Sequence, residues 1–549
     1  MTPDRGPSGL PHRAAGIGAF DVAGIALAAA GALGLALRLV VIRAGLDVPA
    51  PERYNVFYFL YARDEAPMMA ILVAAGVLTL LSRRFRPFRM PAPKPRGALL
   101  FAGLLAVLVA AGARVGERYA MHDYGLSADE FAAEFQSKIF ARGRATSDVP
   151  AAFRPCAGAL VTPFVGWDAK DGRWLSKYMP VYAAIRAVFE RAGGGRWTNP
   201  VLAGASIVLV ALVARRLWPS GAGEAALAAG FLAVSSQFLL MSMSGYAYPA
   251  HLCANLLWLW LWLRDDRIGW ALLPWVGVAA LGLHNPVVHA AFVAPFLVAI
   301  ATARPRARAA YVIGVYALGA GAWLAWLIHR EALLPPWYHD KLALPGLYQL
   351  FFQTMQATLI FSWQAPIVGI LLVVAIVRIR RFEPPVRLIA ASAGLTFAVY
   401  LFYPLNQAHG WGYRYVYGVL GTMVLLAVAA FRPSPGFRTT PRAIFAVGVL
   451  AAAIQIPLRL RQADRVVGPF ARVVEIERRR PEEVVAVDAK AFWYAGDIVR
   501  NDPDAANRPV FVRWDWLGPA QKRALTAAFG SKLRFASPED ARRAGIPGS

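Results

Sequence analysis

Long apolar runs separated by short polar stretches cover most of the chain. Many of these runs extend for about 18 to 24 residues, the length that an α-helix needs to cross the hydrocarbon core of a bilayer. The pattern predicts an all-α polytopic membrane protein with about 13 transmembrane helices. The expected spans are 21–42, 66–81, 97–113, 201–214, 223–241, 247–263, 269–283, 286–302, 309–328, 356–377, 387–403, 413–431 and 442–458.

The basic residues indicate how these spans are oriented. Residues 83–96 carry six cations and no acid, and a second basic cluster follows the predicted span 356–377. Both stretches are expected inside the cell, because cytoplasmic turns are enriched in Lys and Arg. The alternation of spans then places the polar loop 114–200 and the C-terminus outside, on the periplasmic face of a bacterial inner membrane.

Composition supports this class of protein. The residues are 58% hydrophobic, and the mean hydropathy is +0.45. The formal net charge of +25 would suit nucleic acid, but the basic residues lie between apolar runs, where they face anionic lipid headgroups. Cys156 and Cys253 are too few for a disulfide framework and match no metal-binding spacing. The expected partners are therefore membrane lipids and not nucleic acid.

The loop 114–200 contains the strongest candidate for a chemical site. Asp123, Asp129 and Glu130 lie within eight positions, and phenylalanines at helical spacing follow them. This spacing predicts an amphipathic helix that begins near Asp129 and lies along the membrane surface. Ser127 and Glu130 also match a capping box. Two interpretations remain open: a solvated helix start whose carboxylates suit the positive helix end, or a catalytic site.

A second amphipathic stretch, 178–189, follows in the same loop. It has only about 12 residues, too few to cross a core of about 30 Å, and it contains Arg186. It is therefore expected to be a second surface helix, with Lys177 immediately before it.

The tail 463–549 is predicted to be a small soluble α/β module in which short strands and helices alternate along the chain. The expected strands are 484–487, 510–512 and 532–535, and the expected helices are 491–500 and 519–529. The sequence of the tail contains no Gly-rich phosphate loop and no metal motif.

Histidines gather on the predicted outer face, where seven of the eight lie. These seven are His122, His251, His284, His289, His329, His339 and His409, and only His12 is inside. The bias indicates that titratable chemistry is concentrated outside, although each histidine alone can be a capped or solvated one. Asn285 accompanies two of them beside a proline that separates two spans.

Residues 406–417 pack His409, Arg414 and Tyr415 among other aromatic side chains at the start of a span. An aromatic belt with an anchoring arginine is one interpretation. The other interpretation is that the planar guanidinium of Arg414 binds a lipid-linked phosphate through two hydrogen bonds.

These features resemble the GT-C glycosyltransferases, and within that group the chain is most similar to the protein O-mannosyltransferases and the lipid A aminoarabinose transferases. The resemblance is carried by the Asp-Glu pair at a helix start, by Lys-Tyr-x-Pro-x-Tyr at 177–182 and by a span that ends Ala-Arg-Arg-Leu at 214–217, and it covers about 97–264. It implies transfer of a hexose or pentose from a polyprenyl-phosphate carrier to an envelope lipid, glycan or protein on the periplasmic side.

The resemblance also implies roles for particular residues. Asp129 matches the catalytic carboxylate, Glu130 its partner, and Lys177 the basic residue that faces the donor phosphate. The supporting residues expected around them are Asp123 and His122 for catalysis, and Arg414, Tyr415 and His409 for the phosphate. His251 lies where several relatives carry a second carboxylate. With Asp129 it is the candidate pair for a divalent metal, and no other cofactor is expected.

The chain is expected to divide into an additional N-terminal pair of spans (1–96), a GT-C-like core (97–462) and the tail (463–549). The N-terminal pair has its own acidic segment, Arg-Asp-Glu at 63–65, which ranks below Asp129 because no surface helix follows it. Two other function classes stay open: a lipid or polysaccharide transporter, and a non-catalytic envelope assembly protein. A transporter would place charged or broken positions near the bilayer midplane.

Overall fold

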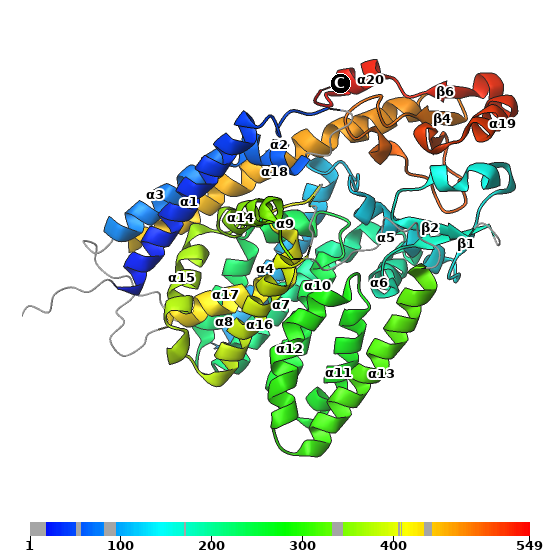
Figure 1. Ribbon diagram of the computed structural model, residues 1–549. Helices are drawn as coiled ribbons and strands as arrows, with labels where there is room; N and C mark the ends of the chain where they lie inside the picture. The colour runs from blue at the N-terminus through cyan, green and yellow to red at the C-terminus, as the bar shows by residue number, and fades with distance from the viewer. Residues whose placement is uncertain are drawn as a thin grey trace, which may run out of the picture.

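The computed structural model describes residues 18–50, 56–81, 95–168, 172–331, 344–403, 407, 409–432 and 442–548. Figure 1 shows a large helical bundle with a smaller region of short strands and helices at one end. The bundle helices are α1 (Ala19–Arg43), α2 (Val56–Asp64), α3 (Ala66–Leu81), α4 (Pro95–Tyr119), α7 (Thr198–Leu217), α8 (Ala222–Ala233), α9 (Ser236–Ser242), α10 (Tyr248–Arg264), α11 (Arg267–Leu281), α12 (Pro286–Thr302), α13 (Arg306–Glu331), α14 (Leu347–Ser362), α15 (Pro366–Val377), α16 (Pro384–Leu401), α17 (Leu420–Phe431) and α18 (Arg442–Arg478).

The number of spans differs from the prediction. Among the described residues, six helices are long and apolar enough to cross a membrane, or up to nine if each of three bent helix pairs is one span. The predicted count of about 13 is therefore not confirmed. Part of the difference lies in α10, α11 and α12, which have 15 to 17 residues. The predicted span 442–458 begins α18, where the side chains of 442–449 are not described.

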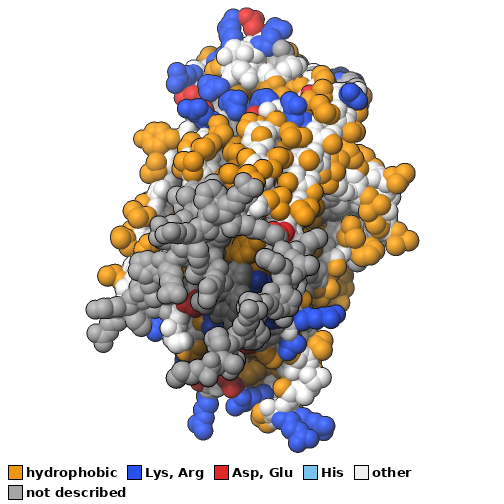
Figure 2. All heavy atoms as spheres, turned by 90° about the vertical axis from the view of Figure 1, so that its left-hand side faces the viewer, with side chains coloured by type: hydrophobic (Ala, Val, Ile, Leu, Met, Phe, Trp, Pro, Cys, Tyr) orange, Lys and Arg blue, Asp and Glu red, His pale blue; other side chains and the backbone are white. Residues whose placement is uncertain are grey.

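Large apolar side chains cover the outside of the bundle. On α4, Leu100 is 76% exposed, and Leu104, Val107 and Leu108 continue the same exposed face. Figure 2 shows a hydrophobic band of this kind on one face of the molecule, with Lys and Arg gathered toward its two ends. Apolar surface of this extent is suited to lipid and not to water. The protein therefore has the surface of a multi-pass membrane protein.

Three helix pairs of the bundle are bent. The predicted span 356–377 is two helices, α14 and α15, that meet at 113°. Ala365 leaves the helical region with ψ 132°, because the ring of Pro366 disfavours the helical conformation in the residue before it. The predicted span 223–241 is likewise divided into α8 and α9 at 65°, where Ser235 caps α9. The third pair, α2 and α3, meets at 53°.

A buried polar network joins these three bends. Glu65, between α2 and α3, forms a bidentate ion pair with Arg459 of α18 at 2.5 and 2.8 Å, and neither side chain is more than 3% exposed. Glu65 also accepts hydrogen bonds from Ser362 and Trp363 at the α14–α15 bend. The N–H of Gln237 in α9 donates to the carbonyl of Trp363 at 3.3 Å. The acidic segment 63–65 thus contributes a contact that holds the N-terminal helices against the bundle.

The loop between α4 and α7 folds into a layer of its own. The two predicted surface helices are present as α5 (Ala128–Ala141) and α6 (Pro180–Arg191). Between them lies an antiparallel sheet in the order β1-β3-β2, in which Trp167 faces Trp174. Its strands are β1 (Ser147–Asp148), β2 (Val165–Asp168) and β3 (Arg173–Ser176). The sequence did not predict this sheet, because strands of two to four residues are too short to show an alternating pattern.

The tail contains the three predicted strands in a parallel sheet of order β5-β4-β6. The strands are β4 (Val484–Val487), β5 (Val510–Arg513) and β6 (Leu533–Phe535), and the helices are α19 (Pro519–Phe529) and α20 (Pro538–Ala544). The helix predicted over 491–500 is wrong, because only a 3₁₀ turn, η7 (Ala495–Ile498), forms there. Tyr494 has φ 56°, a left-handed conformation that interrupts an α-helix.

The loop and the tail pack together into one layer, residues 120–168, 172–197 and 479–548, which we call the cap. One buried apolar cluster contains Trp174 of the loop and Val484 of the tail. The indole N–H of Trp174 donates to the carbonyl of Pro503 at 2.8 Å, and Lys138 forms a 2.8 Å ion pair with Asp502. The two parts adjoin at the right of Figure 1. The acidic loop and the tail therefore lie at the same end of the bundle.

Candidate active site

Asp129 and Glu130 begin α5, and the predicted capping box is confirmed. The Ser127 side chain accepts a hydrogen bond from the N–H of Asp129 at 3.2 Å, and the N–H of Ser127 donates to Glu130 at 3.0 Å. The capping box satisfies N–H groups that a helix start leaves unpaired. It turns the carboxylate of Glu130 back on the chain, while Asp129 contacts other elements.

Asp129 is held by two residues that are distant in sequence. Its Oδ1 accepts a hydrogen bond from the Tyr178 hydroxyl, and its Oδ2 forms a 3.0 Å ion pair with Arg414 of η6 (Arg414–Val419). Only 13% of the Asp129 side chain is exposed. Burial alone would raise the pKa of Asp129, but Arg414, His284 and Tyr178 together lower it below the ordinary value of 3.8. Asp129 is therefore ionised at neutral pH.

Arg414 links Asp129 to the chain that leads into α17. It is 5% exposed, and its guanidinium donates to the His409 carbonyl at 2.9 Å and to the Tyr415 hydroxyl at 3.2 Å. It also lies over the rings of Tyr246 and Tyr415, 5.1 and 5.0 Å from their centres. Its Nε is buried and has no hydrogen-bond partner within the described part of the chain. An unpaired buried donor costs about 1 to 3 kcal/mol.

More polar groups surround Asp129. Lys177 is 8% exposed and adds positive charge near the carboxylate, and its carbonyl accepts a hydrogen bond from Arg330. The ring of Tyr178 packs against His284 with 4.1 Å between ring centres. Burial lowers the pKa of His284 to about 4, so this imidazole is neutral at physiological pH. Its Nδ1 is buried with no partner among the residues described.

Glu130 is anchored through both carboxylate oxygens. Its Oε1 accepts from the backbone N–H of Gly245 at 2.7 Å, and its Oε2 accepts from Ser127. Burial raises the pKa of Glu130 above its ordinary value of 4.5, although both N–H groups oppose the shift. Glu130 therefore ties α5 to the segment before α10, a geometry that suits positioning of Asp129.

Two residues expected to support catalysis contact other parts of the molecule. His122 Nε2 lies 2.6 Å from Asp464 of α18. Asp123 forms a 2.7 Å ion pair with Arg114 of α4. These contacts direct both side chains toward neighbouring helices and not toward Asp129.

The remaining predicted polar residues have different environments. His289 is fully buried and hydrogen-bonds through both ring nitrogens, at 2.7 and 2.9 Å, to side chains of α10 and α13. Asn285 caps α12 by accepting from a backbone N–H at 3.0 Å. His251 lies closer to the site, with 6.3 Å between its ring centre and that of His284. Neither of its ring nitrogens has a partner in the described structure.

The side chains around Asp129 do not fit a divalent metal. Such an ion takes several oxygen ligands, whereas both carboxylate oxygens accept hydrogen bonds from Tyr178 and Arg414. Within the described residues, no group of three or more His, Cys, Asp or Glu is arranged to hold a metal ion. The predicted metal pair of Asp129 and His251 is not supported by this donor set.

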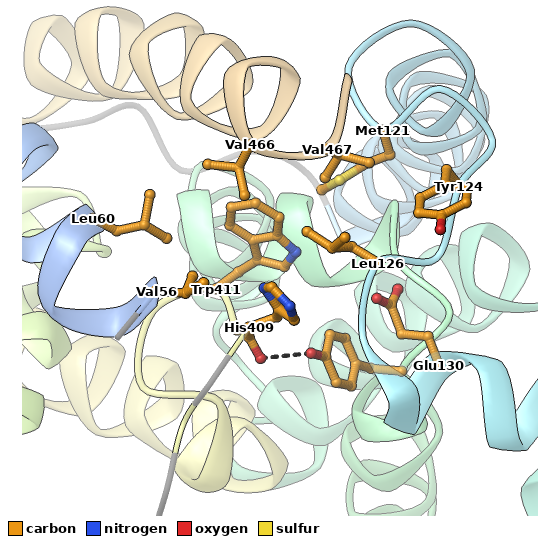
Figure 3. Close-up of a pocket in the computed structure, with 12 residues that line it drawn as sticks. Val56, Leu60, Met121, Tyr124, Leu126, Glu130, His409, Trp411, Val466 and Val467 are labelled. Atoms are coloured by element: carbon orange, nitrogen blue, oxygen red, sulfur yellow. Dashed lines mark hydrogen bonds between the residues drawn. The ribbon is translucent and has the colours of Figure 1, made fainter. Parts of the chain in front are cut away.

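A pocket lies on the other side of Glu130. Its cavity volume is about 10 Å³, and the wider space of about 310 Å³ around it includes open solvent. Figure 3 shows the His409 ring beneath Trp411 and the Glu130 carboxylate directed toward it. His409, predicted to bind phosphate, contacts the tail instead, with its Nε2 2.5 Å from Asp497. Its connection to Arg414 is through its backbone carbonyl.

Some of these residues were missed by the sequence analysis. Tyr178 and Tyr246 lie close in sequence to residues that were predicted to act in the site. Their hydroxyl groups, which can donate hydrogen bonds, were the only sequence feature that could have indicated a role. Arg330 follows a long apolar run and resembles an ordinary anchoring cation. Asp497 lies in a stretch predicted as helix, and no local pattern distinguishes it.

Comparison with known proteins gives a limited result. No family model matches the sequence, and no curated protein matches it. Similar solved structures include that of ArnT from Cupriavidus metallidurans in the apo state, with 12% identity and a TM-score of 0.49 over 81% of this chain and 91% of that chain. ArnT from the same organism bound to undecaprenyl phosphate gives 13% identity, the same TM-score and the same coverage. Likeness at this level assigns no function, which we therefore infer from the side chains around Asp129.

Proposed function

We propose that the protein is a membrane glycosyltransferase that moves a sugar from a polyprenyl-phosphate donor to an envelope acceptor, with its active site under the cap on the periplasmic face. The contact of Asp129 with Arg414 carries this proposal. It joins residues 285 positions apart in a buried site next to a bundle with a lipid-facing surface.

The site suits a leaving phosphate. Arg414 offers an unpaired Nε, and its planar fork matches phosphate oxygens. With Lys177 it would stabilise the negative charge that grows on the phosphate as the bond to the sugar breaks. Asp129, held ionised by Arg414, would stabilise the positive charge that develops at the anomeric carbon. The rings of Tyr246 and Tyr415 cover the guanidinium and strengthen these interactions by limiting water.

A transporter would be expected to carry charged groups at broken helices, and the buried network at the three helix bends is the part of this protein that resembles such a site. Its charges are paired with each other, Glu65 with Arg459, and their other contacts are to neighbouring side chains and backbone. This arrangement supports a structural role for the network and the transferase interpretation for the protein.

The proposal is tested with purified protein in lipid vesicles. A panel of polyprenyl-phosphate-linked hexoses and pentoses is added together with an extract of envelope lipids and glycans as acceptors, and release of polyprenyl phosphate is measured for the parent and for Asp129→Asn. Asp148→Asn is the matched control, because Asp148 is an exposed cap residue paired only with exposed Arg173 among the described contacts. Activity in the parent and the control, and its loss in Asp129→Asn, is expected. A parent that cleaves no donor would contradict the proposal.

A further inference from the structure

We infer that His409 and Asp497 form an acid–base dyad that removes the proton from the acceptor hydroxyl, so that the tail supplies part of the active site. The inference rests on the proposed transferase function and adds the acceptor side to it. It assigns the pocket beyond Glu130 to an amphipathic acceptor.

The geometry of His409 is that of a base oriented by a carboxylate. Its Nε2 lies 2.5 Å from Oδ2 of Asp497, and an ionised carboxylate only accepts hydrogen bonds. The proton of the neutral ring therefore resides on Nε2, which leaves a lone pair on Nδ1. His409 is 7% exposed, and its Nδ1 is buried with no partner in the described part of the chain. The lone pair of this nitrogen is therefore not used by any described hydrogen-bond donor.

The tail is built to present Asp497. The N–H of Asp497 donates to the Tyr494 carbonyl at 2.9 Å, and its carbonyl accepts from Tyr124 and Arg500 at 2.9 and 2.8 Å. Tyr494, held in its left-handed conformation, packs on the imidazole of His409 with 4.5 Å between ring centres. The carboxylate and the ring are thus fixed from both the tail and the loop.

The pocket explains what His409 would act on. Glu130 and the imidazole face one another across it in Figure 3, and the charged groups near the ring include Asp497, Arg414 and Arg500. Most of its remaining wall is apolar, formed by Val56, Leu60, Met121, Leu126, Trp411, Val466 and Val467. A hydroxyl group attached to an apolar body matches this combination of one polar end and apolar sides.

One guanidinium separates the two halves of the site. Arg414 donates from the same nitrogen to Asp129 and to the His409 carbonyl. Asp129 is a poor proton acceptor, because its pKa is lowered and both of its oxygens are engaged. A division of labour follows, with Asp129 and Arg414 on the donor and the dyad on the acceptor.

The reaction balances without a further reagent. The acceptor O–H proton passes to Nδ1 of His409 as the acceptor oxygen bonds to the anomeric carbon. The bond from that carbon to the phosphate oxygen breaks, and polyprenyl phosphate leaves with the electron pair. Asp497 stabilises the imidazolium until its proton passes to water.

The test uses full-length protein in vesicles, the donor that the parent cleaves, and octyl glucoside as the amphipathic acceptor. His409→Gln is expected to lower kcat by about 10² to 10⁴ while KM for the donor stays near that of the parent. Asp497→Asn should lower kcat less than His409→Gln does. It should also move the acid limb of the pH profile of kcat to lower pH, because the imidazolium loses the carboxylate that stabilises it. Asp504→Asn is the control, since Asp504 pairs with Arg142 across the same cap interface.

The outcomes separate the two proposals. An inactive parent overturns the transferase and the dyad together. A parent that loses activity with Asp129→Asn but keeps its kcat with His409→Gln overturns the dyad alone. If His409→Gln fails to fold, an unchanged acid limb in Asp497→Asn overturns it. Glucose replacing octyl glucoside at an equal KM would overturn the amphipathic acceptor.

Discussion

Asp129 depends on its charge more than on its shape, because its two oxygens bind a hydroxyl and a guanidinium. Asp129→Asn keeps the shape and removes the charge. We expect donor turnover to fall by about 10² to 10³, because the charge that stabilises the transition state is lost, measured at equal amounts of folded protein. Asp64→Asn, in the rival acidic segment, should change turnover little, because Asp64 pairs with Arg63 and Arg465. Loss of turnover in Asp64→Asn but not in Asp129→Asn would show that the active site lies in the first loop.

Arg414 opposes the effect of burial on Asp129. In Arg414→Ala, burial is no longer offset, so the pKa of Asp129 should rise. In the parent, the stability from ionised Asp129 is present above its ordinary pKa of 3.8 and is lost as pH falls through the lower folded value. The variant should therefore lose activity at a higher pH than the parent does. Arg414→Lys should keep the parental acid limb but raise KM for the donor, because lysine lacks the bidentate fork. A parental pH profile and KM in Arg414→Ala would contradict both roles.

At the scale of elements, the bends of α2–α3 and α14–α15 are joined to α18 by Glu65 and Arg459. Removing one partner of a buried ion pair costs about 3 to 5 kcal/mol, because the other charge stays buried and unpaired. Glu65→Gln should therefore lower the thermal unfolding temperature of the detergent-solubilised protein. Glu475→Gln is the matched control, because Glu475 forms an exposed pair with Arg479 on the same helix. Equal unfolding temperatures for Glu65→Gln and the parent would show that the pair does not hold these helices together.

At the scale of the whole molecule, the cap joins the loop and the tail. The distribution of basic residues predicts the side of the membrane for each of these regions independently. The loop and the tail share an apolar cluster and the Lys138–Asp502 ion pair, so they must lie on the same side of the membrane. Reporter fusions at Gly172 and Ser549 should both report the periplasm. A cytoplasmic signal from both would reverse the proposed orientation and keep the fold. Opposite signals would contradict the cap itself.

The sequence by itself determined features that depend on neighbouring residues. Helical periodicity and the Ser127–Glu130 capping box are local, and they located α5 and the Asp129–Glu130 pair. Apolar run length identified a membrane protein, and short runs rich in β-branched residues located β4 and β5. Prediction from the sequence failed where the local pattern was weak, as in the short strands around Trp174. It also failed where the folded structure departed from the local pattern, as in the 3₁₀ turn at Asp497.

Tertiary structure decided which distant residues meet. Arg414 could have anchored an aromatic belt, but packing of η6 against α10 brings it to Asp129. Glu65 could have been a rival catalytic acid, yet a helix bend places it against Arg459. His409 was expected at a phosphate, and the fold of the tail gives it Asp497. Contacts between residues far apart in sequence arise from packing, so no local pattern of one chain specifies them.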